Sequence, residues 1–206
     1  MPDKSIMALP DIHTDPAARQ KAKEMLSDGQ ISVFYIEWSK PINPMNLDES
    51  FAGLNPGDAQ PTLKELTALA IHRGIPVVPV DMPPDQVLAT LDRNSPDYAP
   101  HSAASLIQPW GEAVRDEYTG RAIADDMRGR DNGTVALLMY GANHFNPKVD
   151  DGVVLAKPLD ELIRGHGEAD VYKLKLTYGQ EQASSSQPMV DQDPSAKEQK
   201  KSGITM

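Results

Sequence analysis

Cysteine is absent from this chain of 206 residues. Its absence excludes disulfide-stabilised scaffolds, thiolate metal sites and cysteine nucleophiles. No apolar run approaches the roughly 20 residues that a helix needs to cross a bilayer. The chain does not open with a basic segment followed by an apolar one, so we expect no Sec signal peptide. These absences predict a soluble protein without a transmembrane segment, either cytoplasmic or exported by a specialised secretion system.

Positive charge is scarce, with 20 Lys and Arg residues against 30 Asp and Glu and a formal net charge of -10. This balance argues against a general surface for nucleic acid or for an anionic membrane, so we expect no nucleic-acid partner. Aromatic residues make up only 5% of the chain and mean hydropathy is -0.46. The polar excess lies in loops and in the C-terminal tail, so the rest can still form a core.

Four short apolar runs alternate with helical patterns along the chain. Such alternation predicts an α/β fold, with a mainly parallel sheet, right-handed crossovers and helices on both faces. The runs cover residues 5–9, 31–36, 77–80 and 135–140, and the main helices are expected at 16–26, 61–72 and 110–127. Long loop insertions are expected at 39–60, where proline and glycine are frequent, and at 82–109, which holds many turn-forming residues.

The chain divides into one expected domain and a tail. Residues 1–178 carry all the periodic segments, ending with a short helix at 158–163 and an edge strand at 171–176. Residues 179–206 are rich in Gln, Ser, Lys and Asp and contain no aromatic residue. This composition cannot build a core, so we expect the tail to be disordered.

A polar residue suited to chemistry follows each of the four apolar runs. They are His13, Glu37, Asp81 and the pair Asn143-His144. The carboxyl ends of parallel strands meet at one edge of a sheet, where ligands bind in open α/β folds. A histidine there can act as a base or bind a metal. Their repeated placement predicts a single site at this edge.

Three of these positions also have a simpler interpretation. His13 can be a loop histidine beside a helix cap, and Asp81 can cap a turn. Glu37 can pair with Arg73 or Lys40. The coincidence of all four positions favours one site over four separate explanations.

The predicted helix at 110–127 offers further polar residues. Arg115 and Asp116 lie in its middle, and the pattern alone assigns them to a solvated face. Apolar residues expected to face inward are Val114, Tyr118, Ala122 and Ile123. We interpret His72, His101 and His166 as surface residues.

An ordered series of motifs extends over about residues 5–145. It reads "MALPDIHTDPAARQKA", "VFYIEW", "HRGIPVVPVD", "RDEYTGRAIADDM" and "TVALLMYGANHF". This series is similar to that of the erythromycin esterase, ChaN, TraB and Tiki superfamily. Within this superfamily, the motif series most resembles that of effector domains in large bacterial toxins of the dermonecrotic and Pasteurella multocida type.

The resemblance implies a parallel α/β core and two Gly-x-x-His-like motifs, at residues 10–13 and 141–144. It places the family's glutamate on Glu37 and its arginine on Arg115, which makes Arg115 a candidate site residue. In Tiki-like members such residues support metal-dependent peptide cleavage, whereas the esterase branch hydrolyses without a required metal and ChaN binds haem. It also implies a toxin or effector role in virulence, with a host or target-cell protein as partner.

The chain departs from this pattern at the first motif. Pro10 stands where the family has glycine, and Asp11 where glutamate is frequent. Proline removes a backbone amide donor, which weakens the case for backbone contact with a substrate there. Loss of activity in a diverged member is therefore an open alternative.

Hydrolysis of an ester or peptide bond, in a small molecule or a peptide, is the first hypothesis. In it His13 or His144 deprotonates water, Glu37 orients the histidine or shares a metal, and Arg115 holds an anionic group or the oxyanion. Asp81 and Asn143 are the predicted substrate-binding residues.

A divalent metal, if present, is expected on His13, Glu37 and His144. Two histidines and one carboxylate suit zinc or manganese with an open position.

Two alternatives do not involve catalysis. One is a binding module that acts by protein contact or binds haem through Tyr35, Tyr140 or a histidine. The other is a structural domain of a larger delivery system.

Overall fold

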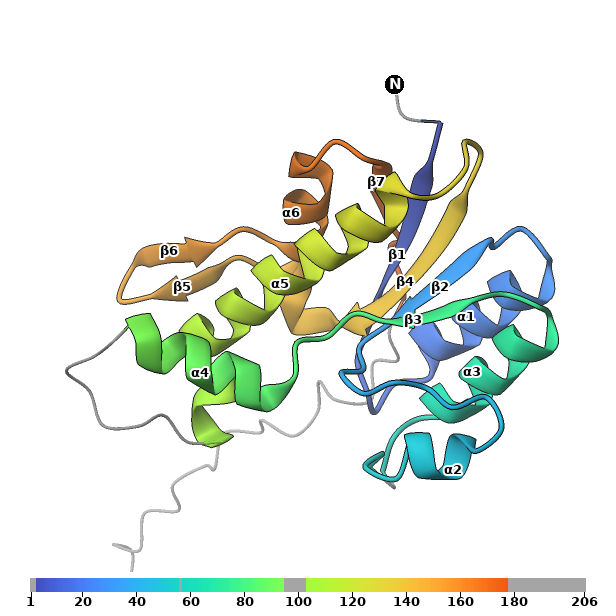
Figure 1. Ribbon diagram of the computed structural model, residues 1–206, viewed down its shortest axis with the longest axis horizontal. Coiled ribbons are helices and arrows are strands. Elements are labelled where there is room, and N and C mark those ends of the chain that lie inside the picture. The colour runs from blue at the N-terminus through green and yellow to red at the C-terminus, as the bar shows by residue number, and fades with distance from the viewer. Residues whose placement is uncertain (1–2, 56, 95–102, 178–206) are drawn as a thin grey trace, which may run out of the picture.

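A five-stranded parallel sheet forms the centre of the molecule (Figure 1). This computed structural model describes residues 3–55, 57–94 and 103–177, so the predicted tail and His101 lie outside the described residues. The strand order is β3-β2-β4-β1-β7, and each neighbouring pair is parallel. The strands are β1 (Ser5–Asp11), β2 (Val33–Ile36), β3 (Val77–Pro79), β4 (Val135–Gly141) and β7 (Asp170–Lys173). The predicted mainly parallel sheet is confirmed.

Helices cover both faces of the sheet, as the alternation predicts (Figure 1). One face packs against α1 (Ala17–Ser27) and α3 (Leu63–His72), and the other against α5 (Pro109–Arg128) and α6 (Leu159–Gly165). Successive residues of a strand point to opposite faces. In β4, Leu137 and Met139 therefore join the α1 and α3 core, whereas Leu138 and Tyr140 join the α5 and α6 core.

Shorter elements occupy the connections. Among its described residues, the long connection after β2 contains one short helix, α2 (Leu47–Ser50), which agrees with the expected loop insertion. The second insertion holds α4 (Pro84–Asn94) and the 3-10 helix η1 (Ala103–Ile107). After β4 come a 3-10 helix, η2 (Ala142–Phe145), and an antiparallel hairpin of β5 (Lys148–Asp150) and β6 (Val153–Ala156). The sequence patterns did not predict this hairpin, which lies beside α5 (Figure 1).

The expected orientation of α5 is wrong at two positions. Asp116 is fully buried instead of solvated, and Tyr118 is 39% exposed instead of facing inward. The buried stripe of α5 includes Asp116, Thr119, Ile123 and Met127, which follow helical spacing. Asp116 belongs to this stripe because η2 and β5 cover the adjoining side of the helix.

Pro10 lies within β1, opposite Tyr140 of β4. Proline is tolerated in a sheet where its missing amide has no strand to bond. The pairing of β1 with β7 ends at Ala8, so at Pro10 the strand pairs with β4 alone.

In the described part of the chain, no helix is both long enough and apolar enough to span a membrane.

A stability prediction follows from the contact between α5 and η1. A Cβ atom on Gly111 would lie 2.1 Å from the backbone oxygen of Ser105, so one of the two backbones must move. We expect Gly111→Ala to lower the free energy of unfolding by about 1–3 kcal/mol, measured by urea denaturation. The matched control is Gly165→Ala at the end of α6, where a Cβ meets nothing within 4 Å. Equal unfolding midpoints for the two variants would show that α5 and η1 are not packed this closely.

Candidate active site

Strand register brings the predicted site residues to one edge of the sheet. Asp11 at the end of β1 is opposite Gly141 of β4, and Ile36 of β2 is opposite both Met139 and Pro79. The segments that follow these strands therefore start side by side at the carboxyl edge.

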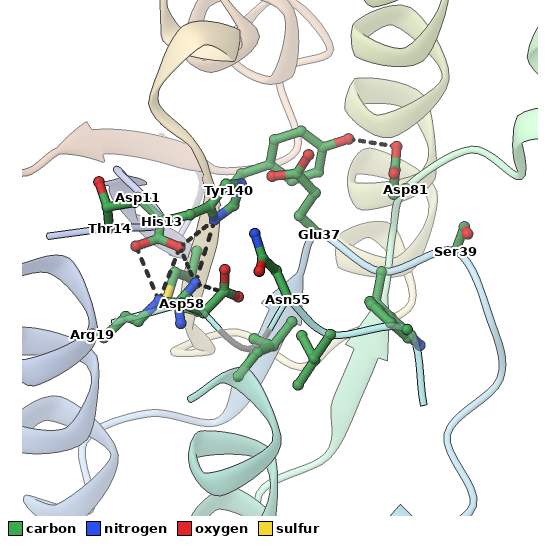
Figure 2. Close-up of a pocket in the computed structure, with 15 residues that line it drawn as sticks. Asp11, His13, Thr14, Arg19, Glu37, Ser39, Asn55, Asp58, Asp81 and Tyr140 are labelled. Carbon is green, nitrogen blue, oxygen red and sulfur yellow. Dashed lines mark hydrogen bonds and ion pairs between the residues drawn. The ribbon is translucent and has the colours of Figure 1, made fainter. Parts of the chain in front are cut away.

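A cavity of about 350 Å³ opens at this edge (Figure 2). Its volume lies within the range of small-molecule sites. Three predicted residues, His13, Glu37 and Asp81, contribute to its wall. The loop after β2 supplies another part of the wall, and the end of β4 supplies a further part. The loop residues are Trp38, Gly53, Leu54, Asn55 and Asp58, and the β4 residues are Met139 and Tyr140.

Glu37 is held at both carboxylate oxygens. Its Oε1 accepts a hydrogen bond from Nη2 of Arg115 at 2.9 Å, and its Oε2 accepts one from the backbone N–H of Gly141 at 2.6 Å. A Cβ on residue 141 would lie 2.9 Å from this Oε2, so a larger residue there would displace the carboxylate from its present position. Glu37 is thereby fixed in one orientation at the cavity wall.

Arg115 contacts carboxylates and is not among the residues that line the described cavity wall. Besides Glu37, it binds Asp81 through Nε at 3.0 Å and Nη2 at 2.8 Å. Burial alone lowers the pKa of Arg115, but the carboxylates of Asp81 and Glu37 raise it above its usual value. The Tyr140 hydroxyl donates to Asp81 at 2.7 Å. Burial and the charges of Asp81 and Glu37 raise the pKa of Tyr140, so this donor stays protonated.

Behind Glu37 lies a buried histidine–aspartate pair. Nδ1 of His144 is hydrogen-bonded to Oδ1 of Asp116, and Nε2 of His144 is 3.7 Å from Oε1 of Glu37. His144 is 4% exposed and packs edge-on against Tyr140. Burial raises the pKa of Asp116, an effect that His144, Lys148 and Arg115 oppose. His144 faces the cavity only through Glu37.

A second histidine–aspartate pair lies at the cavity itself (Figure 2). Nδ1 of His13 is 3.0 Å from Oδ2 of Asp11. The hydrogen bond to Asp11 raises the pKa of His13, burial lowers it, and the charge of Glu37 raises it again, so that the net shift is upward. His13 therefore keeps a proton to higher pH than an ordinary histidine.

Arg19 links the His13–Asp11 pair to the loop after β2. Its side chain is almost fully buried, and its Nη2 lies 3.1 Å from both Asp11 and Asp58. Its Nη1 donates to the carbonyl of Ala59 at 2.9 Å. Burial raises the pKa of Asp11, but the bonds from His13 and Arg19 hold it below its usual range.

The structure brings together most of the predicted residues, in unequal roles. His13, Glu37 and Asp81 reach the cavity, whereas Arg115 and His144 contact Glu37 from behind. Asn143 is exposed, and its carbonyl accepts a bond from Lys148. Its predicted role in substrate binding stays a prediction, as Asn143 is not in the described wall of the cavity. His72 and His166 are exposed, as expected.

Sequence reasoning missed three participants: Asp116, Arg19 and Asp58. One feature of the sequence points to Asp116, because it directly follows the candidate residue Arg115 in the helix. Arg19 and Asp58 meet only because the loop folds back over α1, and nothing in their local patterns indicates this contact.

One of the predicted metal ligands, Glu37, already has both oxygens in hydrogen bonds. The described residues contain no group of three or more His, Asp or Glu side chains arranged to hold a metal ion. Both oxygens of Glu37 are engaged, and the Arg115 cation lies beside it, which disfavours a second positive charge. Zinc or manganese stays a prediction from the motifs, and no step below depends on a metal.

The tyrosines considered for haem are hydrogen-bonded to carboxylates. Tyr35 donates to Asp126, and Tyr140 to Asp81. An axial role would require either hydroxyl to leave its partner, so haem also stays a prediction.

Comparisons with known proteins find similarity among solved structures. No protein-family model matches the chain, and no curated protein matches it. A solved chain described as "Bacterial protein toxins" is similar, with a TM-score of 0.49 and 14% identity. The match covers 86% of this chain but only 36% of that one, so the chain spans about a third of that protein's length. The superfamily suggested by the motifs stays a prediction.

The Asp11–His13 contact gives a prediction about pH. Asn at position 11 has no charge, so we expect Asp11→Asn to lower the pKa of His13, measured by NMR titration of its ring. Because folding raises this pKa above 6.5, the pair contributes stability below about pH 6.5 that fades as pH rises through the folded value. Asp48→Asn is the control, since Asp48 is exposed and pairs with Lys64. An unchanged His13 titration in Asp11→Asn would contradict the assignment.

Proposed function

We propose that the chain is a hydrolase domain that cleaves an ester or peptide bond in a small-molecule or peptide substrate. One observation carries the proposal. A single glutamate, Glu37, lies at the cavity wall with His13 on the cavity side and His144 behind it. Each histidine has Nδ1 on an aspartate, which orients the ring and leaves Nε2 for proton transfer.

Glu37 is the base in this proposal. It accepts a proton from water as the water oxygen attacks the carbonyl carbon of the substrate. Nε2 of His144, 3.7 Å from Oε1, then takes up that proton, and Asp116 stabilises the imidazolium that forms. Glu37 is then a carboxylate again, and the proton is held by the buried His144–Asp116 pair.

His13 is the acid. Its raised pKa favours the protonated ring, which can stabilise the developing oxyanion and give its proton to the leaving oxygen or nitrogen. The bond from the carbonyl carbon to that atom then breaks. Transfer of the stored proton back to His13 through Glu37 completes the cycle.

Arg115 and Asp81 have positioning roles in this scheme. Arg115 binds both carboxylates and fixes their separation, which differs from the direct contact with substrate suggested by the sequence. Asp81 lines the cavity and offers a carboxylate to a hydrogen-bond donor of the substrate.

The proposed setting of this activity is a toxin or effector domain that acts on a host or target-cell component. The ordered motif series from residue 5 to residue 145 supports this setting. No contact in the site bears on it.

A non-catalytic binding module is the second candidate. The observation that favours it is the full engagement of Glu37, whose two oxygens already accept strong hydrogen bonds. One of these bonds must be released or shared before a water molecule can give its proton to Glu37. Binding of a ligand in the cavity without turnover would identify this case.

A screen of chromogenic esters and labelled peptides with the purified chain tests the proposal. Once a substrate is found, we expect Glu37→Gln and His13→Ala each to lower kcat by about 10²–10⁴-fold, since each removes a proton-transfer group. His72→Ala is the matched control, because His72 is exposed at the end of α3.

Other outcomes discriminate among the alternatives. Wild-type rates in both site variants would overturn the proposal. Loss of activity on dialysis against a chelator, with recovery on adding zinc or manganese, would establish the metal-dependent version. A Soret shift on haem titration without turnover would establish the haem-binding version.

A further inference from the structure

The hairpin of β5 and β6 carries an exposed apolar strand. Figure 1 shows the hairpin projecting beside α5, away from the central sheet. Lys148 and Ala156 of the hairpin are buried. In contrast, Val153 and Val154 are each 62% exposed and Leu155 is 40% exposed, so most of β6 presents apolar side chains at the surface. Adjoining exposed apolar residues mark an interaction surface, whereas single scattered ones do not.

β6 is also an edge strand without the features that usually protect such a strand. An edge strand offers unpaired backbone groups to another chain, and charged side chains or proline on the strand prevent this pairing. The two edge strands of the five-stranded sheet have such residues, Pro79 in β3 and Asp170 and Lys173 in β7. β6, with the sequence Val-Val-Leu-Ala, has none, and its sheet contains no strand beyond β5 among the described residues.

The turn of the hairpin determines which backbone groups of β6 face outward. Asp151 and Gly152 both have a positive φ, as a two-residue type I′ turn requires. In such a hairpin the closing pair, here Asp150 and Val153, is hydrogen-bonded, and bonded and unbonded pairs then alternate. Val154 therefore directs its N–H and its C=O away from β5. In the described part of the chain, no backbone group outside the hairpin bonds to them.

The two ends of β6 carry opposite charges. Asp151 lies in the turn before the strand, Lys157 directly follows it, and both are exposed. Extended chain separates the two residues by roughly 15–20 Å, which exceeds the Debye length at physiological salt, so they do not pair within one chain. Neither has an ion-pair partner among the described residues. Each end can therefore take a partner of the opposite charge.

A second copy of the chain meets all of these conditions at once. Two β6 strands can pair antiparallel about a two-fold axis at Val154, so that each Val154 bonds to the other. Val153 of one copy then lies opposite Leu155 of the other. The same register sets Asp151 opposite Lys157, twice in the dimer.

We propose that β6 is a self-association surface, through which two copies join their hairpins into one four-stranded antiparallel sheet. The inference is independent of the proposed function. The contact involves one short strand of each copy and the side chains beside it, which is less than a permanent dimer buries. The dimer is therefore in reversible equilibrium with the monomer, and its population depends on chain concentration.

The experiment is sedimentation and NMR of the full chain from about 10 µM to about 1 mM, a range that covers weak association. We expect the mean mass to rise from that of the monomer toward twice that value. At the high end, the Val154 amide should be protected from hydrogen exchange. A mixture of labelled and unlabelled chains should give intermolecular NOEs between Val154 methyl groups.

Charge variants test the register. Lys157→Glu sets two carboxylates against each other at both ends of the contact, so we expect the dissociation constant to rise about 10-fold. Asp151→Asn removes the repelling charge and keeps a residue that suits the turn, so the double variant should recover part of this loss. Lys23→Glu is the matched control, because Lys23 is exposed on α1, across the central sheet from α5. Recovery in the double variant identifies a contact between copies, since the two residues are too far apart within one.

A backbone variant tests the strand pairing. Val154→Pro removes the outward N–H and no bond to β5, so it should abolish the dimer and leave the far-UV circular dichroism unchanged. The charge variants decide the matter even if Val154→Pro fails to fold.

Three outcomes would overturn the proposal. One is a chain that stays monomeric over the whole concentration range. Another is a dimer that Lys157→Glu weakens no more than Lys23→Glu does, because its interface then lies elsewhere. The third is a monomeric chain with NOEs from Val154 to residues 178–206, which would assign the strand to the chain's own tail.

Discussion

The carboxylate of Glu37 joins three parts of the fold that are distant in sequence. It follows β2, accepts the amide of Gly141 at the end of β4, and binds Arg115 from the middle of α5. Each contact needs a separate feature: a glycine without Cβ, a helix turned to present its arginine, and a strand end at the right register. A buried carboxylate is costly without such partners. Sheet, helix and turn must therefore be in place together before Glu37 can occupy this position.

Around the cavity, each of two arginines lies between two carboxylates. Arg115 lies between Glu37 and Asp81, and Arg19 between Asp11 and Asp58. Removing one partner of a buried pair leaves the other uncompensated, which is more damaging than the net strength of the pair suggests. The edge of the sheet is therefore rigid on both sides of Glu37, and rigid placement is what proton transfer over short distances requires.

The sequence allowed prediction of the sheet edge but not of everything that lies behind it. His13, Glu37 and Asp81 were found because each follows a short apolar run, and strand ends are local features. Asp116 was assigned to a solvated face, since the pattern of α5 cannot show that η2 and β5 would cover it. Arg19 and Asp58 escaped notice for a similar reason, because their contact depends on how a long loop returns over α1. Local periodicity finds elements and their ends, whereas buried ion pairs depend on tertiary packing.

The loop after β2 is connected to His13 and its partner Asp11 at two points. The amide of Ala59 donates to the carbonyl of His13, and Asp58 shares Arg19 with the aspartate that binds the His13 ring. A ligand that pulls Asp58 away leaves the whole guanidinium to Asp11, which weakens the hold of that aspartate on the imidazole. The proton affinity of His13 therefore depends on where the loop after β2 places Asp58.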